Sequence, residues 1–274
     1  MEEVKTLIKR QPFFSTENGQ LYCGDCLEVM DYLIKEGIKV DAIITDPPYE
    51  TTGHSWDKII PFDAMWERLL KLIKDDGAIV LFGNEPFSSN LRKSNEKLYR
   101  YDWKWLKTQV TGFQSSKYQP LRCYEDIMVF SKAGVVNNAS KKMKYYPQGL
   151  IKVNLKVQKK PITYLKDKSK KNMVENQKIT RENTNFPRNV IQFPRESNIV
   201  HPTQKPINLM EYLICTYTKE NEVVLDFTSG SGSTLIACEI SKRKWIGIEK
   251  SEDFCNVIKE RMKKGIQIKM LLEY

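Results

Sequence analysis

This 274-residue sequence predicts an α/β fold in which helices cover both faces of a doubly wound, mostly parallel sheet. Two observations support the prediction. Short apolar runs rich in β-branched residues alternate with helical segments, and such runs are typical of strands buried on both faces. The alternation stops over residues 131–198, where the sequence is polar and basic, and then resumes. The sheet is therefore expected to contain one inserted region.

In the first part of the chain, five expected strands alternate with two expected helices. A continuous apolar run, VDAIITD, predicts a buried strand, and Gly37 and Gly77 are expected to end the two helices. The expected strands cover 19–25, 40–46, 78–83, 101–108 and 124–132, and the expected helices cover 26–37 and 61–77.

After the basic region the same alternation returns. The strands are again short and apolar, and the glycine-rich stretch GSGS separates the first of them from the helix that follows. The expected helices cover 206–220, 232–243 and 251–265, and the expected strands cover 222–227 and 244–250.

The composition limits the class of protein. With 41% hydrophobic and 28% charged residues, the chain reads as globular, and it has no apolar run long enough for a transmembrane helix. The first residues lack the apolar core of a signal peptide, so the six cysteines are expected to be reduced thiols. Cys23 and Cys26 form one C-x-x-C pair, but no second pair follows at ligand spacing, so no metal site is predicted.

The positive charge is concentrated in one stretch. Residues 131–200 contain 16 Lys and Arg against 4 Asp and Glu, a net charge of +12, whereas the rest of the chain has a net charge of −2. Such a stretch is typical of a surface that binds a polyanion, and Lys168, Lys170 and Lys171 are its candidate phosphate contacts. The alternative is a solvated basic loop with no partner.

An unusual motif ends the strand at 40–46. Asp46 is followed by Pro47, Pro48 and Tyr49. Two prolines fix two φ angles and remove two backbone donors, so the segment is stiff and presents acceptors in definite directions. This arrangement suits a ligand that donates hydrogen bonds, although an ordinary rigid turn would share the pattern.

A second strand end carries the sequence DFTSGSG. Asp226 and Phe227 end the strand at 222–227, and Gly230 and Gly232 allow a tight turn into the next helix. Glu249 follows 23 residues after Asp226, near the spacing at which an acid meets ribose hydroxyls in Rossmann-type units. The third glycine of a dinucleotide motif and the Gly-Lys of a P-loop are both missing, so an adenosine ligand without pyrophosphate is favoured.

These motifs together resemble the S-adenosylmethionine-dependent DNA amino-methyltransferases. The Asp-Pro-Pro-Tyr motif precedes the glycine turn by 180 residues, which is the order of the β class of that family. GDCLE at 24–28, HPTQKPINLME at 201–211 and the strand LRCYEDIMVFSK agree with it. The resemblance implies a Rossmann-like methyltransferase sheet with a target-recognition insert. It also implies a cofactor site formed by Asp25, Cys26, Lys205, Asp226, Phe227, Ser229, Gly230, Gly232, Thr234 and Glu249.

The implied activity is transfer of a methyl group from S-adenosylmethionine to the N6 amino group of a flipped-out adenine in double-stranded DNA. The Asp46 carboxylate and the Pro47 carbonyl would accept the amino N–H groups, and Tyr49 would offer a face to the base. N4-cytosine methylation and a non-catalytic nucleic-acid-binding protein on the same fold are the alternatives.

The resemblance also implies three regions and a cellular setting. Residues 1–130 are expected to form the catalytic half of the methyltransferase domain, 131–198 the basic target-recognition insert, and 199–274 the cofactor-binding half. A bacterial or phage-encoded protein, cytoplasmic and associated with the nucleoid, is expected. No membrane partner is expected, and a homodimer stays open.

Overall fold

The computed structural model describes residues 11–50, 57–158, 178–196, 200 and 204–272. Two compact units are present: the larger takes its described residues from Met1–Tyr146 and Asn189–Tyr274, and the smaller spans Pro147–Arg188. Among the described residues, none of the helices combines the length and apolar character that crossing a bilayer requires.

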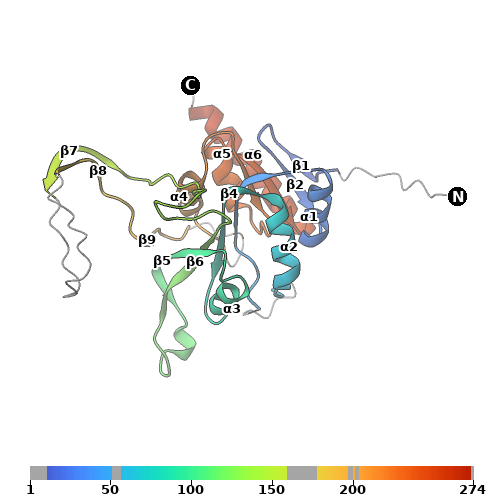
Figure 1. The fold of residues 1–274 in the computed structure, drawn as a ribbon. Helices are drawn as coiled ribbons and strands as arrows, with labels where there is room; N and C mark the ends of the chain where they lie inside the picture. Colours follow the sequence, from blue (N-terminus) through green and yellow to red (C-terminus); the bar gives the residue numbers. More distant parts are fainter. Residues whose placement is uncertain (1–10, 51–56, 159–177, 197–199, 201–203, 273–274) are drawn as a thin grey trace. The chain divides into compact units, whose positions relative to one another are not determined.

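Within the described part of the larger unit, nine strands form one sheet (Figure 1). Four neighbouring strand pairs at its centre run parallel, and antiparallel pairs lie toward both ends. The predicted α/β fold with a mostly parallel sheet is confirmed. The strands are β1 (Phe14–Ser15), β2 (Gly19–Cys23), β3 (Val40–Thr45), β4 (Ile73–Gly83), β5 (Tyr99–Thr111), β6 (Arg122–Phe130), β9 (Val190–Gln192), β10 (Val223–Asp226) and β11 (Lys244–Glu249).

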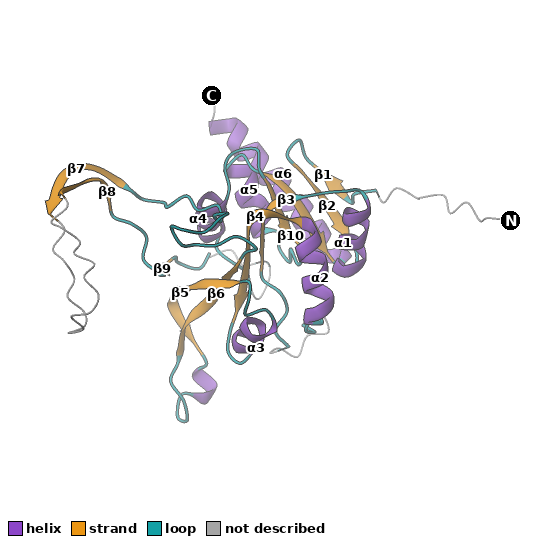
Figure 2. Ribbon diagram, in the orientation of Figure 1, coloured by secondary structure: helices purple, strands orange, loops and turns teal. Residues whose placement is uncertain are grey.

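Helices cover both faces of this sheet, as Figure 2 shows. Apolar side chains of the first three helices pack in one buried cluster, and those of the last three pack in a second cluster on the other face. The sheet is therefore the middle of three layers. The helices are α1 (Cys26–Lys35), α2 (Phe62–Leu72), α3 (Phe87–Ser94), α4 (Ile207–Tyr217), α5 (Ser233–Ile240) and α6 (Glu252–Leu272), with a 3-10 turn, η1 (Phe113–Ser115), between β5 and β6.

The sheet interleaves strands from the N-terminal and C-terminal parts of the chain. The strand order reads β1-β2-β11-β10-β3-β4-β6-β5-β9, so β10 and β11 from the C-terminal part lie between β2 and β3 from the N-terminal part. Because β2, β11, β10 and β3 are parallel, their carboxyl ends meet at one edge of the sheet. Ligands of open α/β sheets bind at such an edge, where the direction of strand winding reverses.

The C-terminal end of α2 differs from the prediction. α2 ends at Leu72, and residues 74–77, which were expected to close the helix, belong to β4. A Cβ on Gly77 would lie 2.6 Å from the Asp41 carbonyl oxygen of the neighbouring strand. Gly77 therefore allows the close approach of β4 to β3 instead of ending a helix.

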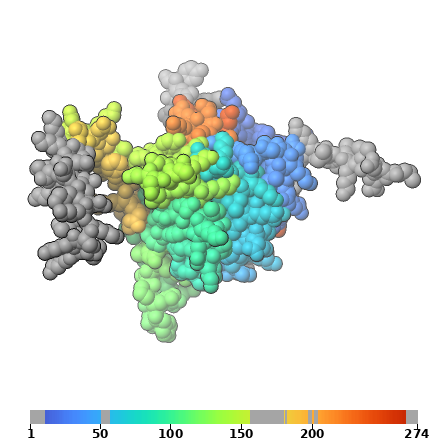
Figure 3. Space-filling view, in the orientation of Figure 1, coloured from blue at the N-terminus to red at the C-terminus, as the bar shows by residue number. Residues whose placement is uncertain are grey.

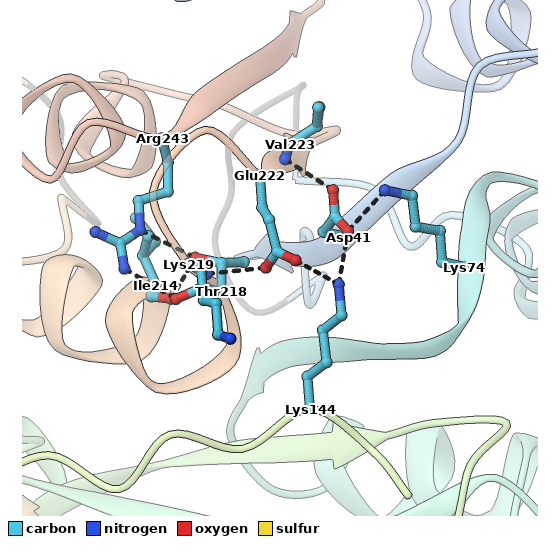
Figure 4. A network of polar contacts seen from close by, with 9 residues as sticks. All are labelled: Asp41, Lys74, Lys144, Ile214, Thr218, Lys219, Glu222, Val223 and Arg243. Atoms are coloured by element: carbon cyan, nitrogen blue, oxygen red, sulfur yellow. Dashed lines mark hydrogen bonds and ion pairs between the residues drawn. The ribbon is translucent and has the colours of Figure 1, made fainter. Parts of the chain in front are cut away.

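A polar network at the amino ends of β3 and β10 fastens the chain that follows β6 (Figure 4). The buried Asp41 carboxylate lies 2.7 Å from both Lys74 Nζ and Lys144 Nζ and accepts the Val223 backbone N–H. Lys144 Nζ also lies 2.6 Å from Glu222. Burial alone would raise the pKa of Asp41, but these donors outweigh it and hold that pKa below its usual value. Lys144, one of the basic residues of the insert, is thus bound to the sheet.

In the described residues of the smaller unit, β7 (Ile151–Gln158) and β8 (Lys178–Thr184) form an antiparallel ribbon. The Asn185 amide donates to the Gly149 carbonyl at 2.7 Å, next to the open end of the ribbon. Ile151 and Leu155 are more than half exposed. Lys168, Lys170 and Lys171 lie outside the described residues.

Candidate functional site

A cavity of about 520 Å³ lies at the carboxyl ends of β2, β3, β10 and β11. Its lining comes from both the N-terminal and the C-terminal parts of the chain, as the strand order requires. All residues predicted for the catalytic and cofactor sites line it except Gly232. They are Asp25, Cys26, Asp46, Pro47, Pro48, Tyr49, Lys205, Asp226, Phe227, Ser229, Gly230, Thr234 and Glu249.

Asp46 directly follows β3, where Pro47 stops the ladder. One carboxylate oxygen accepts the Tyr49 hydroxyl, and the other accepts Lys205 Nζ. The Asp46 backbone carbonyl accepts the Thr228 hydroxyl at 3.1 Å, which ties the motif to the glycine turn after β10. Burial raises the pKa of Asp46, although Lys205 opposes this shift. The Asp46 carboxylate therefore lies at the cavity with both oxygens already engaged by the protein.

Lys205 lies between the buried carboxylate of Glu125 and the partly buried carboxylate of Asp46. Its ammonium binds Asp46 and lies 3.3 Å from Glu125 Oε2 on β6, and Glu125 also pairs with Lys107 on β5. Burial would lower the pKa of Lys205, but Asp46 and Glu125 raise it, so the side chain stays charged. Burial would likewise raise the pKa of Glu125, but Lys205 and Lys107 hold it below its usual value. Glu125 stays ionised and offers Lys205 a second acceptor.

Sequence reasoning missed Glu125 and Lys107 as site residues. The signal was present, because YEDIMVF places two acids inside an otherwise apolar strand, and a buried acid demands a partner. The Lys107 side chain is only 7% exposed and pairs with the Glu125 carboxylate. Its ammonium lies 5.4 Å from the Trp105 ring centroid.

Tyr49 is held from three sides. Its backbone N–H donates to Asp57 at 2.9 Å, its hydroxyl donates to Asp46, and its ring lies 4.8 Å from the Phe87 ring of α3. Burial, together with the nearby charges of Asp46 and Glu125, raises the pKa of Tyr49 well above its usual value. Tyr49 is therefore a neutral, fixed wall of the cavity beside Asp46.

Asp226 ends β10 and lines the cavity. Its carboxylate accepts hydrogen bonds from the Thr45 hydroxyl at 2.5 Å and from the Thr228 backbone N–H at 3.2 Å. The hydroxyl oxygens of Thr45 and Thr228 lie 2.6 Å apart. Burial raises the pKa of Asp226 to about 6, and hydrogen bonds, with Thr234 first among them, partly offset this effect. This cluster joins the ends of β3 and β10 across the sheet.

Glu249 ends β11 and braces the glycine turn. Its carboxylate accepts the Gly230 backbone N–H at 2.8 Å and the Ser251 N–H at 2.9 Å. Gly230 and Gly232 both have left-handed φ angles, +51° and +81°. A Cβ on Gly232 would lie 2.9 Å from Ile258 of α6, so Gly232 acts behind the turn and does not line the cavity.

Asp25 and Cys26 lie at the start of α1. The Asp25 carboxylate caps this helix by accepting the Leu27 N–H at 3.0 Å, and it lies 3.3 Å from Lys250 Nζ. Burial raises the pKa of the Cys26 thiol to about 12, so the thiol is neutral. Both residues line the cavity. They follow β2, whereas the Asp46 motif follows β3, and β11 and β10 lie between these two strands.

Comparison with known proteins points to one family. The family model described as DNA methylase matches residues 40–260. The type II methyltransferase M.HpaI of Haemophilus parainfluenzae is 27% identical over 89% of this chain and 74% of its own. M.BamHI of Bacillus amyloliquefaciens is 25% identical over 99% of this chain, which spans 63% of that longer relative.

Among solved structures, the M1.HpyAVI–SAM complex is similar to this chain. It is 26% identical and has a TM-score of 0.59, and the match covers 89% of this chain and 99% of the other. The region that the family model matches, from β3 to α6, contains both the Asp46 motif and the glycine turn.

Proposed function

Since this chain belongs to the DNA methylase family of N6 and N4 amino-methyltransferases, we propose that it methylates the N6 amino group of adenine in duplex DNA. Its cofactor is S-adenosylmethionine, and its activity is that of a DNA amino-methyltransferase. The choice of adenine rests on Asp46, because the family resemblance associates Asp, rather than Ser, before Pro-Pro-Tyr with adenine. The observation that supports the activity most directly is that Asp46 and the glycine turn line one cavity.

The cavity suits the cofactor in size and in chemistry. About 520 Å³ falls within the range of small-molecule sites, and the lining combines buried apolar surface with a few fixed polar groups. We assign Glu249 to the ribose hydroxyls, because the Gly230 and Ser251 N–H groups fix its carboxylate. Phe227 and Cys26 would supply apolar wall, and Asp25, Ser229 and Thr234 polar contacts. The bound cofactor supplies an electrophilic methyl group on a positive sulfonium.

The protein's own task is to activate a weak nucleophile. The lone pair of an exocyclic amino nitrogen is delocalised into the base, and acceptors for its two N–H groups favour the pyramidal form that frees this pair. The Asp46 carboxylate is one acceptor and the Pro47 carbonyl is proposed as the other. Because burial raises the pKa of Asp46, this carboxylate is also suited to receive the proton that the nitrogen loses after transfer.

Access of the amine to Asp46 requires a change in hydrogen bonding. Lys205 occupies one carboxylate oxygen and Tyr49 the other. Glu125 lies 3.3 Å from Lys205 Nζ and already balances part of its charge. We propose that Lys205 shifts toward Glu125 when the amine arrives, which opens Asp46 without leaving a buried ammonium unpaired.

Residues 131–198 are proposed as the target-recognition region, with Lys168, Lys170 and Lys171 binding phosphates. The described part of this region is the ribbon β7–β8 and its flanks.

The test is to sequence modified bases in DNA from cells that express the protein. N6-methyladenine at one short recurring sequence is expected, and Asp46→Ala should abolish it while S-adenosylmethionine affinity changes only a few-fold. N4-methylcytosine would identify the cytosine member of the family instead. Unmodified DNA, with soluble protein that binds the cofactor, would contradict the proposed activity.

A further inference from the structure

The hairpin between β5 and β6 extends beyond the sheet. Trp105 pairs with Glu125 at the edge of the body and Leu106 with Tyr124, and after a register shift Thr111 pairs with Arg122. β4 pairs with β6 only as far as Asp126, and β9 pairs with β5 only as far as Leu106. Residues 107–124, here called the arm, therefore form a two-stranded projection that has no neighbouring strand in the described part of the chain and is closed by η1 (Figures 1 and 3).

Aromatic side chains near the tip of the arm face solvent. Tyr118 is 90% exposed and Phe113 is 65% exposed, although large aromatic side chains usually bury most of their surface. Neither ring has a ring-stacking or cation partner among the described residues, whereas Tyr124 nearer the root lies against Lys104. Two rings held in water on a thin projection indicate a surface that is completed by a partner.

The composition of the arm identifies the kind of partner. From Lys107 to Tyr124 the sequence KTQVTGFQSSKYQPLRCY has three cations and no carboxylate. Lys117 and Arg122 are exposed in the same segment as the rings, and Gln, Ser and Thr supply most of the remaining side chains. A protein interface would favour a contiguous apolar core, whereas isolated rings among cations and neutral hydrogen-bonding groups are typical of nucleic-acid surfaces.

A chain of ion pairs connects the base of the arm to the Asp46 carboxylate. Lys107 and Glu125 pair across that base, Glu125 lies 3.3 Å from Lys205, and Lys205 binds Asp46. A duplex whose base reaches Asp46 must therefore pass close to the place where the arm leaves the body. The arm is positioned to follow that duplex.

We propose that the arm lies against the duplex and that Phe113 and Tyr118 stack on bases exposed when the target nucleotide leaves the helix. This inference rests on the proposed function and adds the element that opens the duplex. Moving a base out of a duplex costs a few kcal/mol of lost stacking and pairing, and an inserted ring can replace part of that stacking. The arm would thus lower the cost of base opening.

The first experiment compares two double variants on two substrates. Phe113→Ala/Tyr118→Ala removes both rings, whereas Phe113→Tyr/Tyr118→Phe keeps both rings and exchanges the hydroxyl. The substrates are a 30-base-pair duplex with the modified sequence found in cellular DNA and the same duplex with an abasic site opposite the target base. Both rings are exposed, so both variants should unfold at the same temperature as the wild type.

The ring-free variant should lose about tenfold or more in kcat/KM on the paired duplex, as stacking of 1–3 kcal/mol per base would give, and much less on the abasic duplex. The ring-exchanged variant should match the wild type on both. Equal losses on the two substrates, or no loss on either, would overturn the proposal. So would a change in sedimentation of the ring-free variant, because the rings would then belong to an interface between copies.

A second experiment does not depend on methyl transfer. Tyr118→p-benzoylphenylalanine should crosslink to a mixed-sequence 30-base-pair duplex under light, whereas the same replacement at the exposed Ile240 should not. If cellular DNA is unmodified but position 118 crosslinks, the proposed function fails and the arm remains a DNA contact. Equal crosslinking at both positions, or none at 118, would overturn the arm proposal even for an active methyltransferase.

Discussion

At the scale of single residues, the central feature of the site is one lysine shared by two carboxylates. Lys205 binds Asp46 and lies 3.3 Å from Glu125, and both acids lie within the same largely buried cluster. Breaking a buried ion pair is costly because it leaves a charge uncompensated. In the proposed reaction Glu125 would remove that cost when Asp46 turns to another donor, which would make Glu125 a positioning residue.

Glu125→Gln should therefore slow methyl transfer more than it weakens binding. With the charge of Glu125 removed, Lys205 is held by Asp46 alone and resists displacement by the base amine. We expect a loss of about tenfold in the single-turnover rate, equivalent to about 1.4 kcal/mol in the barrier. S-Adenosylmethionine affinity should stay within about twofold.

Asp102→Asn is a suitable control, because Asp102 is also an ion-paired acid of the β5–β6 ladder, where its partners are Lys104 and Arg92. It should leave the single-turnover rate unchanged. An unchanged rate in Glu125→Gln would show that Lys205 does not need its second partner.

Asp226 should make the free energy of unfolding depend on pH. Its pKa is about 6 in the folded protein, against about 3.9 for an unfolded aspartate, because burial disfavours the charged form. The folded state therefore binds this proton more readily. The stability that Asp226 contributes is fully present below pH 4 and is lost as pH rises through 6, a change of about 2–3 kcal/mol.

The measurement is urea unfolding of the wild type and Asp226→Asn between pH 4 and pH 7. Asparagine does not titrate, so the difference in free energy of unfolding between the two proteins should shift in favour of the variant as pH rises. Other titrating groups, including Asp41, are common to both proteins and cancel. Parallel pH profiles would mean that Asp226 titrates near its ordinary pKa in the folded state.

At the scale of elements, the glycine turn between β10 and α5 combines two demands. Gly232 has a left-handed φ of +81°, and its missing Cβ leaves room for Ile258. Gly37 has a similar φ of +71°, but a Cβ there would meet nothing within 4 Å. A side chain at Gly37 would therefore add backbone strain alone, whereas one at Gly232 would add both backbone strain and a steric clash with Ile258.

Gly37→Ala should cost about 1–2 kcal/mol in the free energy of unfolding, the cost of a left-handed residue with a side chain. Gly232→Ala should cost more, because Ile258 must also move, and it should weaken S-adenosylmethionine binding by displacing the turn. Urea unfolding and calorimetry measure the two effects. Equal costs at the two positions, with unchanged cofactor affinity, would show that α6 yields without disturbing the site.

The sequence predicted the elements of the sheet body better than the elements outside it. β3, β10 and β11 are continuous apolar runs, and the Asp46 motif and the glycine turn follow them as expected. Gly77 was misread because a strand-to-strand approach and a helix end both call for glycine. The arm was missed because its position depends on the pairing of β5 with β6 and not on local periodicity. α3 was missed because its eight residues contain only two buried apolar side chains, Phe87 and Leu91, too few to establish a helical period.

The partners of Asp46 could be predicted only in part. Lys205 was recognised through its motif, yet its contact with Asp46 joins positions 159 residues apart and follows from no local pattern. The same holds for Glu125 and Lys107, which meet because β5 and β6 pair in one particular register.

At the scale of the whole molecule, the excess positive charge is divided between structural and candidate DNA-binding roles. Lys132 and Lys141 pair with Asp75, and Lys144 pairs with Asp41 and Glu222, so the first part of the basic stretch is bound to the sheet. The candidate phosphate contacts therefore belong to the later part, which contains Lys168, Lys170 and Lys171.

Neutralising Lys168, Lys170 and Lys171 together to Gln should weaken DNA binding about equally for all sequences and flatten its dependence on salt. Each lost phosphate contact lowers the slope of log K against log salt by about 0.9. The matched control neutralises Lys242, Lys263 and Lys264, which are exposed on the C-terminal part of the chain. If both triple variants change the slope equally, the effect is one of net charge and not of a phosphate-binding surface.

The position of β10 and β11 between β2 and β3 also has a consequence for synthesis on the ribosome. The nascent chain releases β2 and β3 early, but β10 and β11, which lie between them in the sheet, emerge much later. Until then both inner edges present unpaired backbone groups, which favour aggregation and invite chaperones. Because the cavity takes its lining from β2 and β3 and also from β10 and β11, the protein can bind its cofactor only after β10 and β11 have been synthesised.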